Sequence, residues 1–190
     1  MIYSWKKIVK HGLPLLSVTI FIEIAAGQLL QGNEEVLMLF PIFLISVPVI
    51  NSVGGNIGSI LGARLASGLH VGYISLSLKD KEMHDNLFMS LLLGGVTYIV
   101  LAVIIYLVYI VFLSRSSAGG DVGLVDFISI VFLTGVLLVF VVSIVSVFTA
   151  FLSYKKGVDP DDMVAPVVTT IGDVMGILFL FLLIQIVLGV

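Results

Sequence analysis

Residues 91–113 read LLLGGVTYIVLAVIIYLVYIVFL, a stretch with no charged side chain and with apolar residues on every helical face. A helix that crosses a membrane needs about 20 predominantly apolar residues. Strands of an outer-membrane barrel are shorter and alternate apolar with polar residues, which this stretch does not do. The stretch therefore predicts a membrane-spanning α-helix.

Four other parts of the chain are long and predominantly apolar. The chain has 190 residues, of which 59% are hydrophobic and 11% are charged, whereas an ordinary soluble domain carries about 25% charged residues. We therefore expect an all-α integral membrane protein of the cell membrane, with residues 1–190 forming a single multi-pass transmembrane domain. The five predicted helices cover about residues 12–31, 37–66, 87–113, 125–153 and 162–189.

The composition also excludes several kinds of chemistry. The chain has no cysteine, which rules out disulfides, thiolate metal sites and thiol catalysis. Its formal net charge of -3 and its scattered basic residues give no footprint for nucleic acid, so we expect none as a partner. The functional groups must be oxygen, nitrogen or backbone groups, and we expect no bound cofactor.

Basic residues mark one side of the membrane. On the other side the loops contain a single basic residue, Arg115. The positive-inside rule therefore places the N-terminus in the cytoplasm and, with five spans, the C-terminus outside. The basic residues of the cytoplasmic side are Lys6, Lys7, Lys10, Lys79, Lys81, Lys155 and Lys156.

The second predicted helix, 37–66, is too long for one straight span and contains Pro41, Pro48 and the pair Gly54-Gly55. We expect it to be long and broken, with a bend or an unwound turn in its middle. Non-helical backbone at membrane depth is tolerated only where it is buried in protein or lines a water-filled cavity. This segment is therefore expected to face the inside of an assembly.

Two carboxylates, Glu23 and Asp173, lie well inside predicted spans. A charge at the bilayer centre costs about 2.5–3.5 kcal/mol, so such residues usually face a cavity and mark an ion or substrate path. The alternative is a protonated carboxyl that only forms a hydrogen bond between helices. We favour the functional interpretation for Asp173 and leave both open for Glu23.

The residues around Asp173 extend this interpretation. Thr169 and Thr170 precede it by four and three positions, so both can lie near its face of the helix, and Pro166 can free a backbone carbonyl. Carboxylate, hydroxyl and carbonyl oxygens are the ligands that hard cations such as magnesium and calcium prefer. Further back, Asp159-Pro160 is typical of a helix start, with the aspartate as its cap.

The second helix offers a partner for this element. Gly54, Gly58 and Gly62 recur every four residues, a pattern that favours close helix packing. Asn51 and Asn56 lie on the same helix, and buried amides need hydrogen-bond partners. These two amides either line a pore or hold the broken backbone.

Two motifs together resemble the membrane domain of the MgtE-type magnesium transporters and of their animal solute-carrier relatives. The first lies on the second helix and consists of Pro48, Gly55-Asn56-Ile57-Gly58, Arg64 and Gly68. The second leads into the fifth helix and consists of Asp159-Pro160, Pro166, Thr169-Thr170 and Asp173.

The resemblance implies a dimer with one pore lined by the second and fifth helices, in which Asp173 of each chain faces a hydrated magnesium ion. It also implies that backbone carbonyl oxygens near Thr169 face the ion and that Gly55 and Asn56 line the pore. Glu23 is then a second acidic residue along the ion path. Magnesium is then the transported ion. The animal relatives hold two such halves in one chain, so we expect pairing with a second copy or with a related half.

The bacterial members of this family also carry a cytoplasmic sensor domain and have Gln where this chain has Ile60. Only about ten residues precede the first predicted helix, so gating by such a sensor is not expected.

The expected mechanism is electrostatic. Two Asp173 carboxylates across a two-fold axis repel each other, and a divalent cation between them cancels both charges. Magnesium sheds water reluctantly, so we expect it to pass mostly hydrated, through either a channel or a coupled exchanger. One alternative is a sodium- or proton-coupled carrier of another substrate. An intramembrane hydrolase would need two carboxyls that share a proton, and no second intramembrane aspartate exists, so we do not expect an enzyme.

Overall fold

The computed structural model describes residues 5–113, 120 and 122–189, and all the secondary structure in these ranges is helical. Five of the helices are long and apolar enough to cross a membrane, which confirms the expected all-α, multi-pass fold. A short π-helical turn, η1 (Tyr109–Leu113), follows α4. The α-helices are α1 (Trp5–Gly32), α2 (Glu34–Leu39), α3 (Pro41–Val71), α4 (Lys81–Val108), α5 (Leu124–Lys155) and α6 (Pro160–Leu188).

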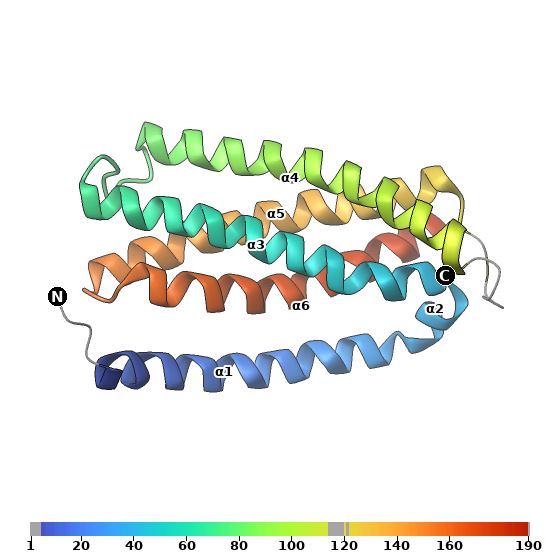
Figure 1. Cartoon of the computed structure of the whole chain (residues 1–190), viewed down its shortest axis with the longest axis horizontal. Coiled ribbons are helices and arrows are strands. Elements are labelled where there is room, and N and C mark those ends of the chain that lie inside the picture. Colours follow the sequence, from blue (N-terminus) through green and yellow to red (C-terminus); the bar gives the residue numbers. More distant parts are fainter. Residues whose placement is uncertain (1–4, 114–119, 121, 190) are drawn as a thin grey trace.

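The long helices lie side by side in one bundle (Figure 1). α5 contacts α3, α4 and α6, and α3 also contacts α4 and α6. α1 packs along α6 at the edge of the bundle, so α6 has α3 on one side and α1 on the other. The largest fully buried side chains come from α3 to α6 and include Tyr98, Phe43, Phe127, Ile50, Leu61, Leu138 and Ile184.

Glycines on α3 let the neighbouring helices approach closely. A Cβ atom on Gly58 would overlap Val168 of α6 and would lie 3.0 Å from Cβ of Val142 on α5. A Cβ atom on Gly62 would overlap Val164 of α6. The glycine stripe is therefore a packing surface, as its four-residue spacing predicts.

One end of the bundle carries the start of α1, the connection from α3 to α4 and the connection from α5 to α6 (Figure 1). These are the places where the basic residues were expected to share one side of the membrane. The assignment of that side to the cytoplasm stays a prediction. Arg115, the basic residue expected on the other side, lies outside the described residues.

The second predicted helix needs a correction. α3 is helical without interruption from Pro41 to Val71, through Pro48 and Gly54-Gly55, so the unwound turn expected in its middle is wrong. The break lies instead at Phe40, between α2 and α3. Pro41 sits in the first turn, where its missing N–H has no helical partner to lose. Pro48 removes only one N–H, and packing against the buried glycines stabilises the continuous helix.

The other helix boundaries follow the prediction more closely, except that α1 begins at Trp5 and α4 at Lys81, each several residues early. Polar residues at the ends extend these helices beyond their apolar parts. The predicted start of the last helix is confirmed, because the Asp161 N–H donates to Oδ1 of Asp159 at 3.1 Å. This cap sets the residue at which α6 begins.

Candidate functional site

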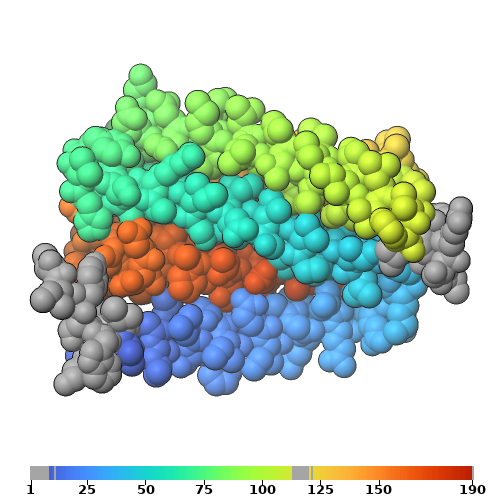
Figure 2. All heavy atoms as spheres, viewed as in Figure 1, coloured from blue at the N-terminus to red at the C-terminus, as the bar shows by residue number. Residues whose placement is uncertain are grey.

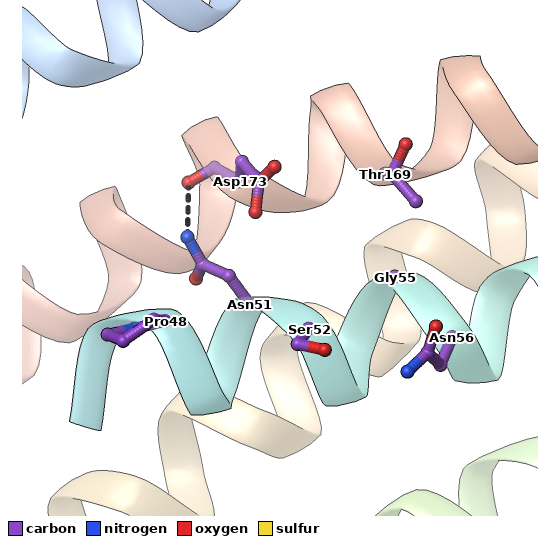
Figure 3. A pocket seen from close by; sticks show the side chains of 7 residues that line it. All are labelled: Pro48, Asn51, Ser52, Gly55, Asn56, Thr169 and Asp173. Atoms are coloured by element: carbon purple, nitrogen blue, oxygen red, sulfur yellow. Dashed lines mark hydrogen bonds between the residues drawn. The ribbon is translucent and has the colours of Figure 1, made fainter. Parts of the chain in front are cut away.

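A pocket lies between α3 and α6, about midway along both helices. Its volume is about 320 Å³. A liquid water molecule takes about 30 Å³, so the pocket has room for several waters or for a small hydrated ion. α3 contributes five of its residues and α6 contributes two (Figure 3). The lining residues are Pro48, Asn51, Ser52, Gly55, Asn56, Thr169 and Asp173.

The two helices lie close together at the pocket, where Gly55 faces Thr169. A Cβ atom on Gly55 would lie 3.1 Å from Cγ2 of Thr169, so a glycine is what allows this spacing. The Thr169 hydroxyl donates to the carbonyl oxygens of Ala165 at 2.9 Å and Pro166 at 3.2 Å, both on its own helix. Its hydrogen is used in this way, and the lone pairs of its oxygen are left for a ligand.

Asp173 is partly buried on α6. Its backbone oxygen accepts a hydrogen bond of 3.2 Å from Nδ2 of Asn51, and Figure 3 shows this amide extending from α3 to α6. Glu23 of α1 lies beside Asp173, close enough for the two carboxyl groups to interact directly. The arrangement places two acidic groups next to a pocket whose other polar atoms belong to amides, hydroxyls and backbone.

The structure brings together most of the residues named from the sequence. Gly55, Asn56, Thr169 and Asp173 all line the pocket. Glu23 does not line it, although it lies next to Asp173 from the α1 side. Within the described ranges, no three histidine or acidic side chains gather into a metal-binding group.

Three lining residues were not named as site residues from the sequence: Pro48, Asn51 and Ser52. Asn51 was one of two amides expected either to line a pore or to hold the broken backbone, because an amide inside an apolar helix needs a partner, but its partner was unknown. Pro48 was named as a helix breaker and as part of the motif on the second helix, without a role in the site. Ser52 carried no signal, since a single small hydroxyl within a helix is common.

The pocket opens on a face of the chain where α3 and α6 are uncovered. In Figure 2 the surfaces of these two helices lie open between those of α1 and α4. Ser52 and Asn56 are exposed there, and Ala63 and Ser67 continue the exposed side of α3 toward its end. The residues on this side of a membrane-spanning helix are small or polar rather than large and apolar. Such a surface suits contact with water or another protein better than contact with lipid tails.

Comparison with known proteins bears on this arrangement. Residues 47–183 match the family model MgtE, which is described as a divalent cation transporter. The match includes every residue of the pocket and nearly all of α3 to α6, and α1 with Glu23 lies before it. The comparison with curated proteins gives no match.

Proposed function

Because this chain belongs to the MgtE family of divalent cation transporters, we propose that it carries magnesium through a pore that forms where two copies join their α3–α6 faces. The observation that carries the proposal is the place of Asp173. This carboxyl lies in the middle of a spanning helix and lines a pocket that opens on a polar face. A carboxylate at that depth is costly unless it faces water, an ion or a partner.

The chemistry of the pocket favours a hard cation. Its side chains offer carboxylate, amide and hydroxyl oxygens, without imidazole or sulfur. Magnesium and calcium prefer such oxygen ligands, whereas zinc and copper favour nitrogen or sulfur. Magnesium also keeps most of its water, and a pocket of about 320 Å³ accommodates an ion with its first water shell. In this proposal Asp173, Thr169, Gly55 and Asn56 hold the hydrated ion, mainly through its waters.

A second copy supplies what one chain lacks. The polar side of α3 needs cover at membrane depth, and the same face on a second copy would provide it. Asp173 of both copies would then meet across a two-fold axis. Two carboxylates in a low dielectric repel strongly, and a divalent cation between them cancels both charges. A closely related half would serve in the same way.

The position of Glu23 favours a second candidate, a transporter coupled to protons. Glu23 lies beside Asp173 and is a second carboxyl at membrane depth, where such groups mark ion or proton paths. In that case, cation movement would depend on an imposed pH gradient. A pore without coupling would carry magnesium along its own gradient regardless of pH difference.

The test is magnesium flux into proteoliposomes that contain the purified protein. We expect Asp173→Asn, which keeps size and removes charge, to lower the flux at least about tenfold. Asp85→Asn, an equal change at the exposed start of α4, is the matched control and should leave flux unchanged. Light scattering reports whether both variants keep the oligomeric state of the wild type.

Each other outcome has a clear meaning. Equal flux for Asp173→Asn and wild type would remove Asp173 from the pathway. Absence of any divalent flux in the wild type would reject magnesium transport by two identical copies. The second candidate would be favoured if the flux requires a pH gradient in the wild type and no longer requires it in Glu23→Gln.

A further inference from the structure

We propose that Asn51 is a positioning residue of the cation site, one that fixes the turn of α6 carrying Asp173 against α3. This inference rests on the function proposed above. Asn51 is buried, with only 7% of its surface exposed. Its Nδ2 donates to the backbone oxygen of Asp173 at 3.2 Å, across 122 positions of the chain. The bond reaches the same residue whose carboxyl faces the pocket.

α3 is also hydrogen-bonded to the two other spanning helices that it contacts, α4 and α5. The hydroxyl of Tyr98, a fully buried residue of α4, donates to the backbone oxygen of Ile50 at 2.7 Å. The hydroxyl of Ser146 on α5 shares its hydrogen between the backbone oxygens of Gly58 on α3 and of Val142 on its own helix, each at 2.7 Å. These bonds fix α3 on both sides of Asn51 along the helix. Asn51 therefore ties α6 to a helix that is itself anchored.

α6 provides space for this amide at one glycine. A Cβ atom on Gly176 would overlap Oδ1 of Asn51 and would lie 3.3 Å from Cδ2 of Leu138. Gly172, one turn earlier on α6, differs: its nearest neighbour would be Cγ1 of Val142 at 3.5 Å, an ordinary contact. The room at Gly176 is thus filled by the Asn51 side chain, whereas Gly172 has room for a methyl group.

Packing alone does not account for an asparagine at this position. Oδ1 of Asn51 is buried and has no hydrogen-bond partner among the described residues. A buried acceptor without a partner destabilises a fold, and leucine has nearly the same shape without this cost. What asparagine adds is the donor to Asp173. The residue therefore serves the site at the expense of stability.

Loss of the Asn51 donor is predicted to lower the affinity of the site for the cation. Without the Asn51 donor, α6 keeps its own helical hydrogen bonds, and Asp173 stays in the pocket but in a looser position. A neutral hydrogen bond of this kind corresponds to roughly a three- to tenfold change in an equilibrium constant. We expect the KM for magnesium to rise by that factor.

The experiment measures initial flux against magnesium concentration in proteoliposomes, together with thermal unfolding of the same full-length proteins. Asn51→Leu should raise KM roughly three- to tenfold while its unfolding temperature stays equal or rises. Gly176→Ala should raise KM in the same direction by displacing the amide.

Two matched controls accompany these variants. Ser146→Ala removes a side-chain hydrogen bond to α3 away from the pocket. It should lower the unfolding temperature and leave KM unchanged, because the bond from Tyr98 to Ile50 still holds α3 next to Asn51. Gly172→Ala places the same methyl group one turn away from Gly176 and should leave KM unchanged.

The outcomes separate the inference from the function on which it rests. An unchanged KM in Asn51→Leu, with flux lost in Asp173→Asn, would overturn the inference and leave the function standing. A KM increase in Ser146→Ala as large as that in Asn51→Leu would show general loosening and would also overturn it. Absence of magnesium flux in the wild type, or full flux in Asp173→Asn, would overturn the function and the inference together.

Discussion

α3 and α4 both present one side on the surface of the chain, and the two sides differ in chemistry. Between Pro48 and Ser67, the exposed residues of α3 are small, polar or charged, apart from one isoleucine: Pro48, Ser52, Asn56, Ile60, Ala63, Arg64 and Ser67. Along the corresponding part of α4, the exposed residues are large and apolar: Phe88, Met89, Leu92, Leu93, Val96, Ile99, Val100, Val103 and Ile104.

The difference shows that surfaces equally exposed in one chain are suited to different surroundings. The outer side of α4 loses nothing when it faces hydrocarbon, because lipid tails are as apolar as leucine. The outer side of α3 would leave amide and hydroxyl groups without hydrogen-bond partners in lipid. α4 therefore fits the lipid boundary, and α3 fits water or a second protein surface. The pocket with Asp173 lies on the α3 side.

The largest effects on folded yield and on flux are expected when a lysine is placed first on the exposed side of α4 and then on that of α3. Val100→Lys puts a charge in the middle of the lipid-facing side, which costs about 2.5–3.5 kcal/mol on insertion scales and should sharply reduce the folded yield in the membrane. Asn56→Lys should insert and fold, because its side is expected to be wet or covered by protein. It should nevertheless lower magnesium flux at least about tenfold, because the ammonium repels the ion. The folded yield, unfolding temperature and flux of both variants are measured. An equal loss of folded yield in the two variants would contradict the difference between the α3 and α4 surfaces.

Much of this contrast was predictable from the sequence. Apolar runs identify five spans, because each one depends only on local composition. Glu23 and Asp173 were identifiable as charges inside those runs, and the four-residue spacing of the α3 glycines predicts packing. Gly55, Asn56, Thr169 and Asp173 were named together through the resemblance, and the structure brings them to one pocket.

Other features depend on contacts between distant parts of the chain. The continuity of α3 was not predictable because Pro48 and Gly54-Gly55 weaken an isolated helix, and only the neighbouring helices compensate. The bond from Asn51 to Asp173 needs the register of α3 against α6, which no local pattern contains. The use of Gly176 as space for an amide has the same origin.

A smaller effect is expected from one methyl group added on the inner side of α3 and on α4. In Gly58→Ala the new Cβ would overlap Val168 and press on Val142, which should destabilise the fold by roughly 1–3 kcal/mol. In Gly95→Ala nothing lies within 4 Å of the new atom, and alanine favours a helix over glycine by up to about 1 kcal/mol. Thermal unfolding in detergent should therefore give a lower midpoint for the first variant and an equal or higher one for the second. The same midpoint in both would mean that α3 is not closely packed at Gly58.

The smallest effect concerns the start of α4, where Asp80 caps the helix. Its carboxylate accepts hydrogen bonds from the N–H of Ser75 at 3.0 Å, the hydroxyl of Ser75 at 2.6 Å and the N–H of Met83 at 3.1 Å. The bonds from Ser75, and then that from Met83, hold the pKa of Asp80 below its ordinary value of 3.8. A carboxyl whose pKa is lowered by folding stabilises the fold above the unfolded value and loses that contribution as the pH falls through the folded one. Asp80→Ala should therefore lower the unfolding temperature at pH 7, and its difference from wild type should shrink below about pH 3.8. A difference for Asp80→Ala that persists unchanged into acid would show that the charge of the cap contributes nothing.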